Sequence, residues 1–196
     1  MCLHRLQVTT RSALGALAFH SGGITVDGGW LRILGGGHPP LPDLANVNRL
    51  GEPDPTSSSP PLLEVARDVL GGRFAVNGGG LPGTAGEVSY FAPDTLRWEP
   101  LGMGHSEFIA WALSGRTTAF YDKQRWPGWA QEVAKLGLDE GLSIYAPLFT
   151  TQGRDIASTS RRPVAWSELR AFTDDMQQQM AAIPDGKPFV LRISDE

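Results

Sequence analysis

The sequence predicts an α+β domain in which a twisted antiparallel sheet is packed on one side by helices. Glycine and proline supply 24 and 15 of the 196 residues, which is typical of a chain with many turns and short strands. Short alternating apolar runs occupy the first half of the chain, whereas apolar residues at helical spacing occupy the second half. Strands followed by helices favour the α+β class. We expect residues 1–196 to form a single domain, because the chain is short for two.

The first half is predicted to form strands joined by glycine-rich turns. Residues 13–35 are expected to be strands separated by Gly-Gly turns, with Asp27-Gly28 as a hairpin signal. The next stretch is rich in Pro, Ser and Gly, so it is expected to be a long irregular loop whose residues 51–60 are mobile. Alternating apolar residues then predict three further strands, at 72–78, 86–93 and 95–101.

The stretch 62–68, LLEVARD, fits two structures. Leu62, Val65, Ala66 and Val69 have helical spacing, whereas the β-branched residues and the following Gly71-Gly72 pair fit a strand that ends in a turn or bulge. Periodicity alone leaves both alternatives open.

The second half is predicted to be helical, with a last strand at 187–194. Helices are expected at 106–115, 126–137 and 166–183, because apolar residues recur there at steps of three and four. Ser106 is the expected N-cap of the first helix and Gly115 its end.

Composition excludes several classes of partner. The net charge is −4, and the most basic feature is the dipeptide Arg161-Arg162, so we expect no nucleic-acid partner. No run of 18 apolar residues occurs, so we expect no membrane partner. Cys2 is the only cysteine, which excludes an internal disulfide and fits a cytoplasmic location. The apolar run that ends at residue 19 is too short for a secretory signal, so we interpret it as a strand.

The glycine-rich stretch 77–83, NGGGLPG, matches the pattern of a dinucleotide-binding loop. That pattern needs a helix after the glycines, because the helix N-terminus holds the phosphate. Here Pro82 interrupts the motif and a predicted strand follows it. We therefore expect no cofactor and interpret the stretch as a wide hairpin connection whose glycines permit positive φ.

The four histidines show no metal-binding spacing, so no metal site is expected. His105, Ser106 and Glu107 are adjacent, and neighbours at a helix start point in different directions, so we predict no catalytic residue. The alternative is a small hydrolase or transferase that pairs His38 or His105 with Glu107 or Asp94.

The stretch 120–129, FYDKQRWPGW, has the composition of an interface hot spot, because aromatic residues alternate there with cations. We expect Phe120 and Trp129 to lie in the core. The candidate partner-binding residues are Tyr121, Arg125 and Trp126, expected to form a partly exposed patch, together with His38 and Asn77. The same patch would serve a symmetric contact if the protein were instead an oligomeric structural module, so the oligomeric state is left open.

Several blocks of sequence resemble an uncharacterised bacterial family, the domain-of-unknown-function 2625 family. They are LQVTTRSALGALAF (6–19), WLRILGGGHP (30–39), GGRFAVNGG (71–79), VSYFAPDTLRWEPLGMGHSEFIAWALSG (88–115) and FYDKQRWPGW (120–129). The resemblance also implies a helical stretch ahead of residue 6, most of which this chain lacks.

A second similarity is to the SUKH superfamily, which includes bacterial immunity proteins and yeast cell-wall regulators. It rests on the strand with Gly-Gly, the polar turn and the block HSEFIAWAL at 105–113. This similarity implies an α+β domain that binds a protein partner without catalysis, and it implies that 62–68 is a strand. We therefore expect a cytoplasmic, non-catalytic protein-binding or immunity-like domain.

Overall fold

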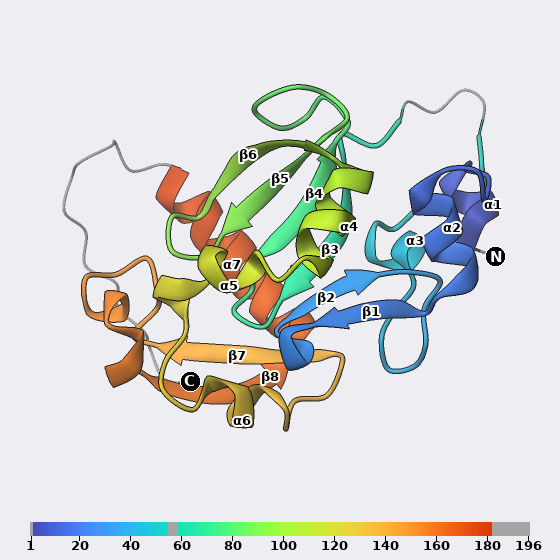
Figure 1. The fold of residues 1–196 in the computed structure, drawn as a ribbon. Helices are drawn as coiled ribbons and strands as arrows, with labels where there is room; N and C mark the ends of the chain where they lie inside the picture. The colour runs from blue at the N-terminus through green and yellow to red at the C-terminus, as the bar shows by residue number, and fades with distance from the viewer. Residues whose placement is uncertain (1, 55–58, 182–196) are drawn as a thin grey trace.

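The computed structural model of the chain describes residues 2–54 and 59–181. Its main feature is a six-stranded sheet in which each strand pairs antiparallel with the next along the chain (Figure 1). The strands are β1 (Gly23–Val26), β2 (Leu31–Leu34), β3 (Leu62–Asp68), β4 (Arg73–Asn77), β5 (Glu87–Ala92) and β6 (Arg97–Gly104). The predicted α+β class with an antiparallel sheet is confirmed.

Strand β3 resolves the ambiguity at 62–68 in favour of a strand. It lies between β2 and β4, and its residues from Glu64 to Asp68 are all buried. The pairing register with β4 shifts between Glu64 and Ala66, so a bulge interrupts the strict alternation. The bulge explains why the adjacent residues Val65 and Ala66 are both apolar and buried, a pattern that also fits a helix.

The expectation that residues 13–20 form a strand is wrong, because they form helix α2 (Ala13–His20). Ser12 caps this helix by accepting a hydrogen bond from the Gly15 N–H at 3.0 Å. Alanine and leucine, which dominate the segment, are strong helix formers. The short helix α1 (Cys2–Leu6) packs against both α2 and the short helix α3 (Leu44–Val47) (Figure 1). The expected hairpin turn at Asp27-Gly28 is confirmed, since Gly28 has φ 63° between β1 and β2.

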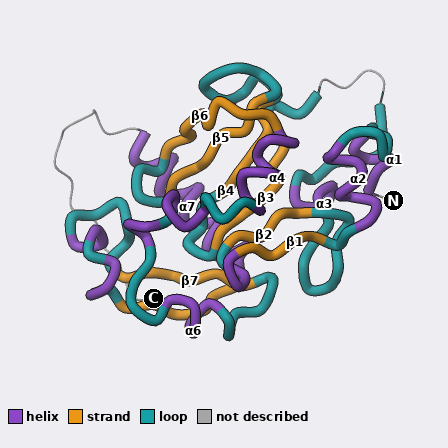
Figure 2. The backbone as a smooth tube through the Cα atoms, in the orientation of Figure 1, coloured by secondary structure: helices purple, strands orange, loops and turns teal. Residues whose placement is uncertain are grey.

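The second half forms helices and a separate hairpin. The helices are α4 (His105–Leu113), α5 (Thr117–Phe120), α6 (Trp129–Val133) and α7 (Trp166–Ala181), and β7 (Glu140–Tyr145) pairs with β8 (Ser160–Ala165). Figure 2 shows this hairpin beside the six-stranded sheet. The three predicted helices are present, although α6 is shorter than its prediction. The hairpin was not predicted, and the expected strand at 187–194 lies outside the described residues.

The N-cap of α4 is Gly104 and not Ser106, so the cap lies two residues earlier than expected, and the Glu107 carboxylate accepts the Gly104 N–H at 2.9 Å. Gly115 follows the end of α4 with φ 80°, as expected for a stop.

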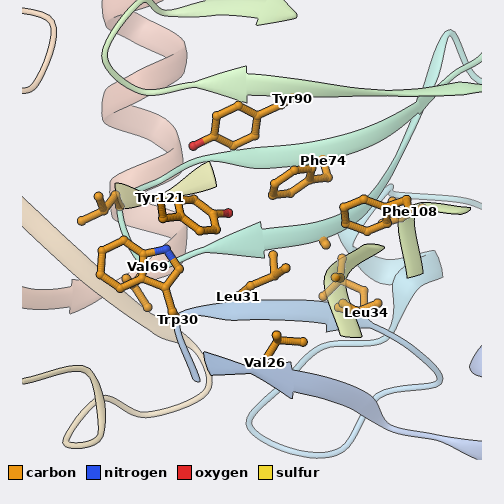
Figure 3. Close-up of a cluster of buried hydrophobic side chains, with 14 of the residues drawn as sticks. Val26, Trp30, Leu31, Leu34, Val69, Phe74, Tyr90, Phe108 and Tyr121 are labelled. Atoms are coloured by element: carbon orange, nitrogen blue, oxygen red, sulfur yellow. The ribbon is translucent and has the colours of Figure 1, made fainter. Parts of the chain in front are cut away.

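Helices lie along both faces of the sheet. Figure 1 shows α4 and α5 in front of the strands and α7 behind them. The sequence predicted helices on one side of the sheet only, so the position of α7 on the opposite face was not expected (Figure 1). The front face buries aromatic rings, and Phe74 lies 4.7 Å from Tyr90 and 4.9 Å from Phe108 between ring centroids (Figure 3). Within residues 2–54 and 59–181, no helix is long and apolar enough to span a lipid bilayer.

Candidate functional site

Tyr121, a predicted partner-binding residue, lies in the core. It is completely buried, and its hydroxyl donates to Asp68 Oδ2 at 3.2 Å. Tyr90 donates to the same oxygen at 2.9 Å, while Asp68 Oδ1 accepts the Leu70 and Gly72 N–H groups at 2.9 and 2.8 Å. Burial raises the pKa of Asp68, although these hydrogen bonds oppose the shift. The group is therefore a structural link between β3, β5 and α5, and it is not open to a partner.

The expectation that Trp126 is partly exposed is also wrong, whereas Arg125 is intermediate in burial. Trp126 is 3% exposed, and the Arg125 side chain is 9% exposed. The Arg125 guanidinium pairs with Asp27 and lies 4.3 Å from the ring centre of Trp129. Aromatic residues with an arginine are typical of an interface hot spot. In this structure, the same residue types instead hold the β1–β2 turn against α6.

His38 and Asn77 lie in two different loops. His38 is exposed, and its Nδ1 lies 3.1 Å from the Pro39 carbonyl. Asn77 is 2% exposed, and its Oδ1 accepts the N–H groups of Gly79 and Leu81 at 2.8 and 3.1 Å. Asn77 therefore orders the loop between β4 and β5. Partner binding by His38 stays a prediction, and Asn77 has a structural role here.

The glycine-rich stretch 77–83 is a hairpin connection, as interpreted from the sequence. Strand β5 follows it instead of a helix, and Gly79 and Gly83 have φ values of 105° and 90°. No helix N-terminus is present here to hold a phosphate.

The histidine–carboxylate pairs required for the hydrolase alternative are not formed. Both ring nitrogens of His105 are buried without a hydrogen-bond partner, and burial lowers the pKa of this histidine. Glu107 caps α4 instead. Among the described residues, no group of three or more His, Cys, Asp or Glu side chains could hold a metal ion.

The described structure contains a cleft of about 600 Å³, here called the charged cleft. Three segments line it: the β5–β6 turn, the α5 helix with the 3₁₀ turn that follows it (Asp122–Gln124), and the loop from β7 to β8. Its lining residues are Asp94, Ala119, Phe120, Asp122, Lys123, Gln124, Leu148, Gly153, Arg154 and Ile156.

The apolar part of the charged cleft belongs to the core. Phe120 packs edge-on against Tyr90 and Trp111, with ring centroids 5.1 and 5.2 Å apart. Ile156 is 6% exposed. Gly153 approaches the Pro147 carbonyl so closely that a Cβ would lie 2.0 Å from its oxygen, so only glycine fits there. These contacts fix two walls of the cleft.

The polar part of the charged cleft consists of four exposed charged side chains: Asp94, Asp122, Lys123 and Arg154. Within the described part of the chain, none of them forms a salt bridge within 4.0 Å. From the sequence, Asp94 was a candidate only for a catalytic carboxylate, and Lys123 was only one of the cations between the aromatic residues of 120–129. No motif pointed to Arg154, which lies in a 3₁₀ turn of the β7–β8 loop.

A smaller apolar hollow, here called the apolar crevice, adjoins the charged cleft. It is lined by Leu70, Pro93, Leu142, Ile144, Pro147, Leu148, Phe149, Leu169, Phe172 and Thr173. Leu148 lines both hollows, and Pro93 of the crevice is followed by Asp94 of the cleft. The two hollows therefore lie side by side, and together they are called the recessed surface below.

The comparisons with known proteins agree with the sequence blocks described above. The model of the family described as "Protein of unknown function DUF2625" matches residues 1–169. The chain is 43% identical over 179 residues to the putative uncharacterized protein YbfG of Escherichia coli, which covers 91% of this chain and 78% of that protein. It is 37% identical over 161 residues to an uncharacterized protein of Haemophilus influenzae, covering 82% of this chain and 70% of that protein. No solved structure matches. The chain thus belongs to the DUF2625 family.

Proposed function

We propose that this protein is a non-catalytic binding protein whose ligand is a segment of another protein, bound at the charged cleft and the apolar crevice. One observation carries the proposal. Four charged side chains of both signs, which form no salt bridge among the described residues, line a cleft with an apolar floor, and an apolar hollow lies beside it. The cleft volume lies within the range of about 300–1,000 Å³ that is typical of ligand sites.

Binding fits this geometry better than catalysis does. General acid–base catalysis needs a base within hydrogen-bond reach of the proton it removes, and a second group that orients the base. No histidine lines the charged cleft, and Cys2 lies outside it. The side chains of the cleft are suited to hold opposite charges and apolar groups.

A protein segment fits the recessed surface better than a small molecule does, because the surface has two parts of different chemistry. An interface typically combines an apolar centre with a polar, charged rim. The similarity of the sequence to the SUKH superfamily supports the same class of ligand. An immunity-like role in the cytoplasm, in which the bound protein is a toxin, is the specific form of this proposal.

Site-specific crosslinking tests the proposal. A photoreactive amino acid is placed at position 123 of the full chain in the native cell, and a matched control carries it at position 135. Lys123 and Lys135 are both exposed, but Lys135 lines neither hollow. We expect a covalent adduct with one other protein from position 123 and none from position 135. Equal labelling from both positions, or an adduct of two copies of this chain, would contradict the proposal.

A further inference from the structure

We infer that the charged cleft selects a polypeptide segment that carries an acidic and a basic side chain close together, next to one apolar side chain that enters the crevice. This inference rests on the proposed function and specifies the chemistry of the bound segment. It follows from how the charges of the cleft are arranged and from the size and position of the crevice.

Among the described residues, the four charged side chains of the cleft share one hollow without forming a salt bridge, whereas other charges form close ion pairs. On the α7 face, Arg73 Nη1 lies 2.7 Å from Asp174, and beside the hairpin Arg161 Nε lies 3.0 Å from Glu132. The two carboxylates and two cations of the cleft share one hollow, yet none forms a salt bridge within 4.0 Å among the described residues. Each sign is therefore available to a bound ligand.

A ligand of mixed charge matches this arrangement. An anionic ligand would be attracted by Lys123 and Arg154 but repelled by Asp94 and Asp122, and a cationic ligand would meet the reverse. A ligand that places an acidic group near the cations and a basic group near the carboxylates gains both attractions. The ligand class is therefore a segment with one side chain of each sign.

The apolar crevice adds a third requirement. The rings of Phe149 and Phe172 lie 6.4 Å apart between centroids and 29° from parallel, and Phe172 is 38% exposed. The free space in the crevice is about 20 Å³, which is on the scale of one water molecule or methyl group. It therefore fits the tip of one aliphatic side chain.

A polypeptide can satisfy all three requirements over a few residues. The crevice and the cleft meet at Leu148 and at the Pro93-Asp94 bond. An extended chain advances about 3.3 Å per residue, so neighbouring side chains can reach both hollows.

Selection from a library of displayed random peptides on the full chain tests the inference. The library is selected on the wild type, on Lys123→Met/Arg154→Met and on Asp94→Asn/Asp122→Asn. Lys135→Met and Asp175→Asn serve as controls, because both residues are exposed and line neither hollow. We expect wild-type selection to enrich peptides with an acidic, a basic and an aliphatic residue within a short window.

One enriched peptide is then measured with its Glu replaced by Gln or its Lys by Met. Each loss should weaken binding about two- to fivefold, as is typical of exposed ion pairs. The variant without cleft cations should no longer distinguish Glu from Gln but should still distinguish Lys from Met, and the variant without cleft carboxylates should show the converse. The two control variants should behave as the wild type does.

Enriched peptides without the charge pair, equal binding by the neutralised variants, or no enrichment above the empty support would each overturn the inference. The crosslinking experiment separates this failure from failure of the proposed function. An adduct from position 123 without charge-selective peptides would leave protein binding in place and remove only the mixed-charge requirement.

Discussion

The two faces of the six-stranded sheet are held by different chemistry, although the same strands build both. On the front face, Phe74 is completely buried against the rings of Tyr90 and Phe108. On the back face, the neighbouring residue Arg73 is 4% exposed, pairs with Asp174 of α7 and lies over the ring of Phe91 at 4.2 Å. Successive residues of a strand point to opposite faces, so a single step along β4 separates an aromatic core from a charged layer.

The back face also contains buried polar atoms that form no hydrogen bond among the described residues. Glu64 is 1% exposed, and its Oε2 lies 3.0 Å from Arg170 of α7 without the alignment of a hydrogen bond. A buried ion pair loses most of its Coulomb gain to desolvation, so such contacts fix the position of α7 more than they add stability. We conclude that the front face supplies the stability of the sheet and the back face orients α7, whose residues Leu169, Phe172 and Thr173 line the apolar crevice.

Replacing Phe74 by Ala should have the largest effect on stability. The substitution removes a completely buried ring from the aromatic core and leaves a cavity. We expect a loss of about 3–5 kcal/mol in the free energy of unfolding, measured by urea denaturation. A loss below about 1 kcal/mol would show that the front face is not the main source of stability.

Replacing Arg73 by Met should cost much less, about 1 kcal/mol in the same measurement. The methionine keeps the apolar contact with Phe91, and Asp174 is half exposed, so water can solvate it when the arginine is lost. If Arg73→Met destabilised the protein as strongly as Phe74→Ala, the distinction between the two faces would be wrong.

Replacing Glu64 by Gln should change how stability depends on pH. Burial raises the pKa of Glu64 in the folded protein, against the attraction of Arg170. A raised folded pKa contributes stability below the unfolded pKa, near 4.5, and that contribution is lost as the pH rises through the folded pKa. Relative to the wild type, Glu64→Gln should therefore gain stability as the pH rises from 4.5 to neutral. Parallel curves of unfolding free energy against pH would contradict this expectation.

Replacing Lys123 by Met should have the smallest effect on stability. Lys123 is exposed in the charged cleft and forms no salt bridge among the described residues, so we expect a change within about 0.5 kcal/mol. Thermal denaturation of Lys123→Met beside Lys135→Met measures this. A large loss would mean that the cleft charges support the fold, and binding tests with these variants would then lose their meaning.

The sequence predicted the strands whose alternation is uninterrupted. Phe74 and Val76 alternate on β4, and Val88 and Tyr90 alternate on β5, so both strands were expected where they lie. Helix α2 was mistaken for a strand because its short apolar run precedes a Gly-Gly pair that was interpreted as a turn between strands. In the structure Gly15 allows α2 to approach Thr9, since a Cβ there would lie 2.1 Å from the Thr9 carbonyl oxygen. That contact is not visible in a local pattern.

The candidate site was predicted less well, because the residue types of a stretch do not show which of its side chains are buried in the fold. Tyr121 and Trp126 have the residue types of a hot spot, but Tyr121 is buried and its hydroxyl donates to Asp68, 53 residues earlier in the chain. The neighbours Asp122 and Lys123 belong to the same predicted stretch but line the cleft instead. Arg154 reaches the cleft only because the unpredicted β7–β8 hairpin carries its loop there. The predicted stretch therefore contributes to the candidate cleft, but Tyr121, Arg125 and Trp126 do not line it.

The most direct test of protein binding at the recessed surface compares crosslinking from position 123 with and without Arg154→Met and Asp94→Asn in the same chain. We expect a single heterologous adduct from the parent, a clear fall in its yield in the doubly substituted chain and unchanged thermal stability. An adduct of undiminished yield in the substituted chain would show that the charged cleft does not hold the partner.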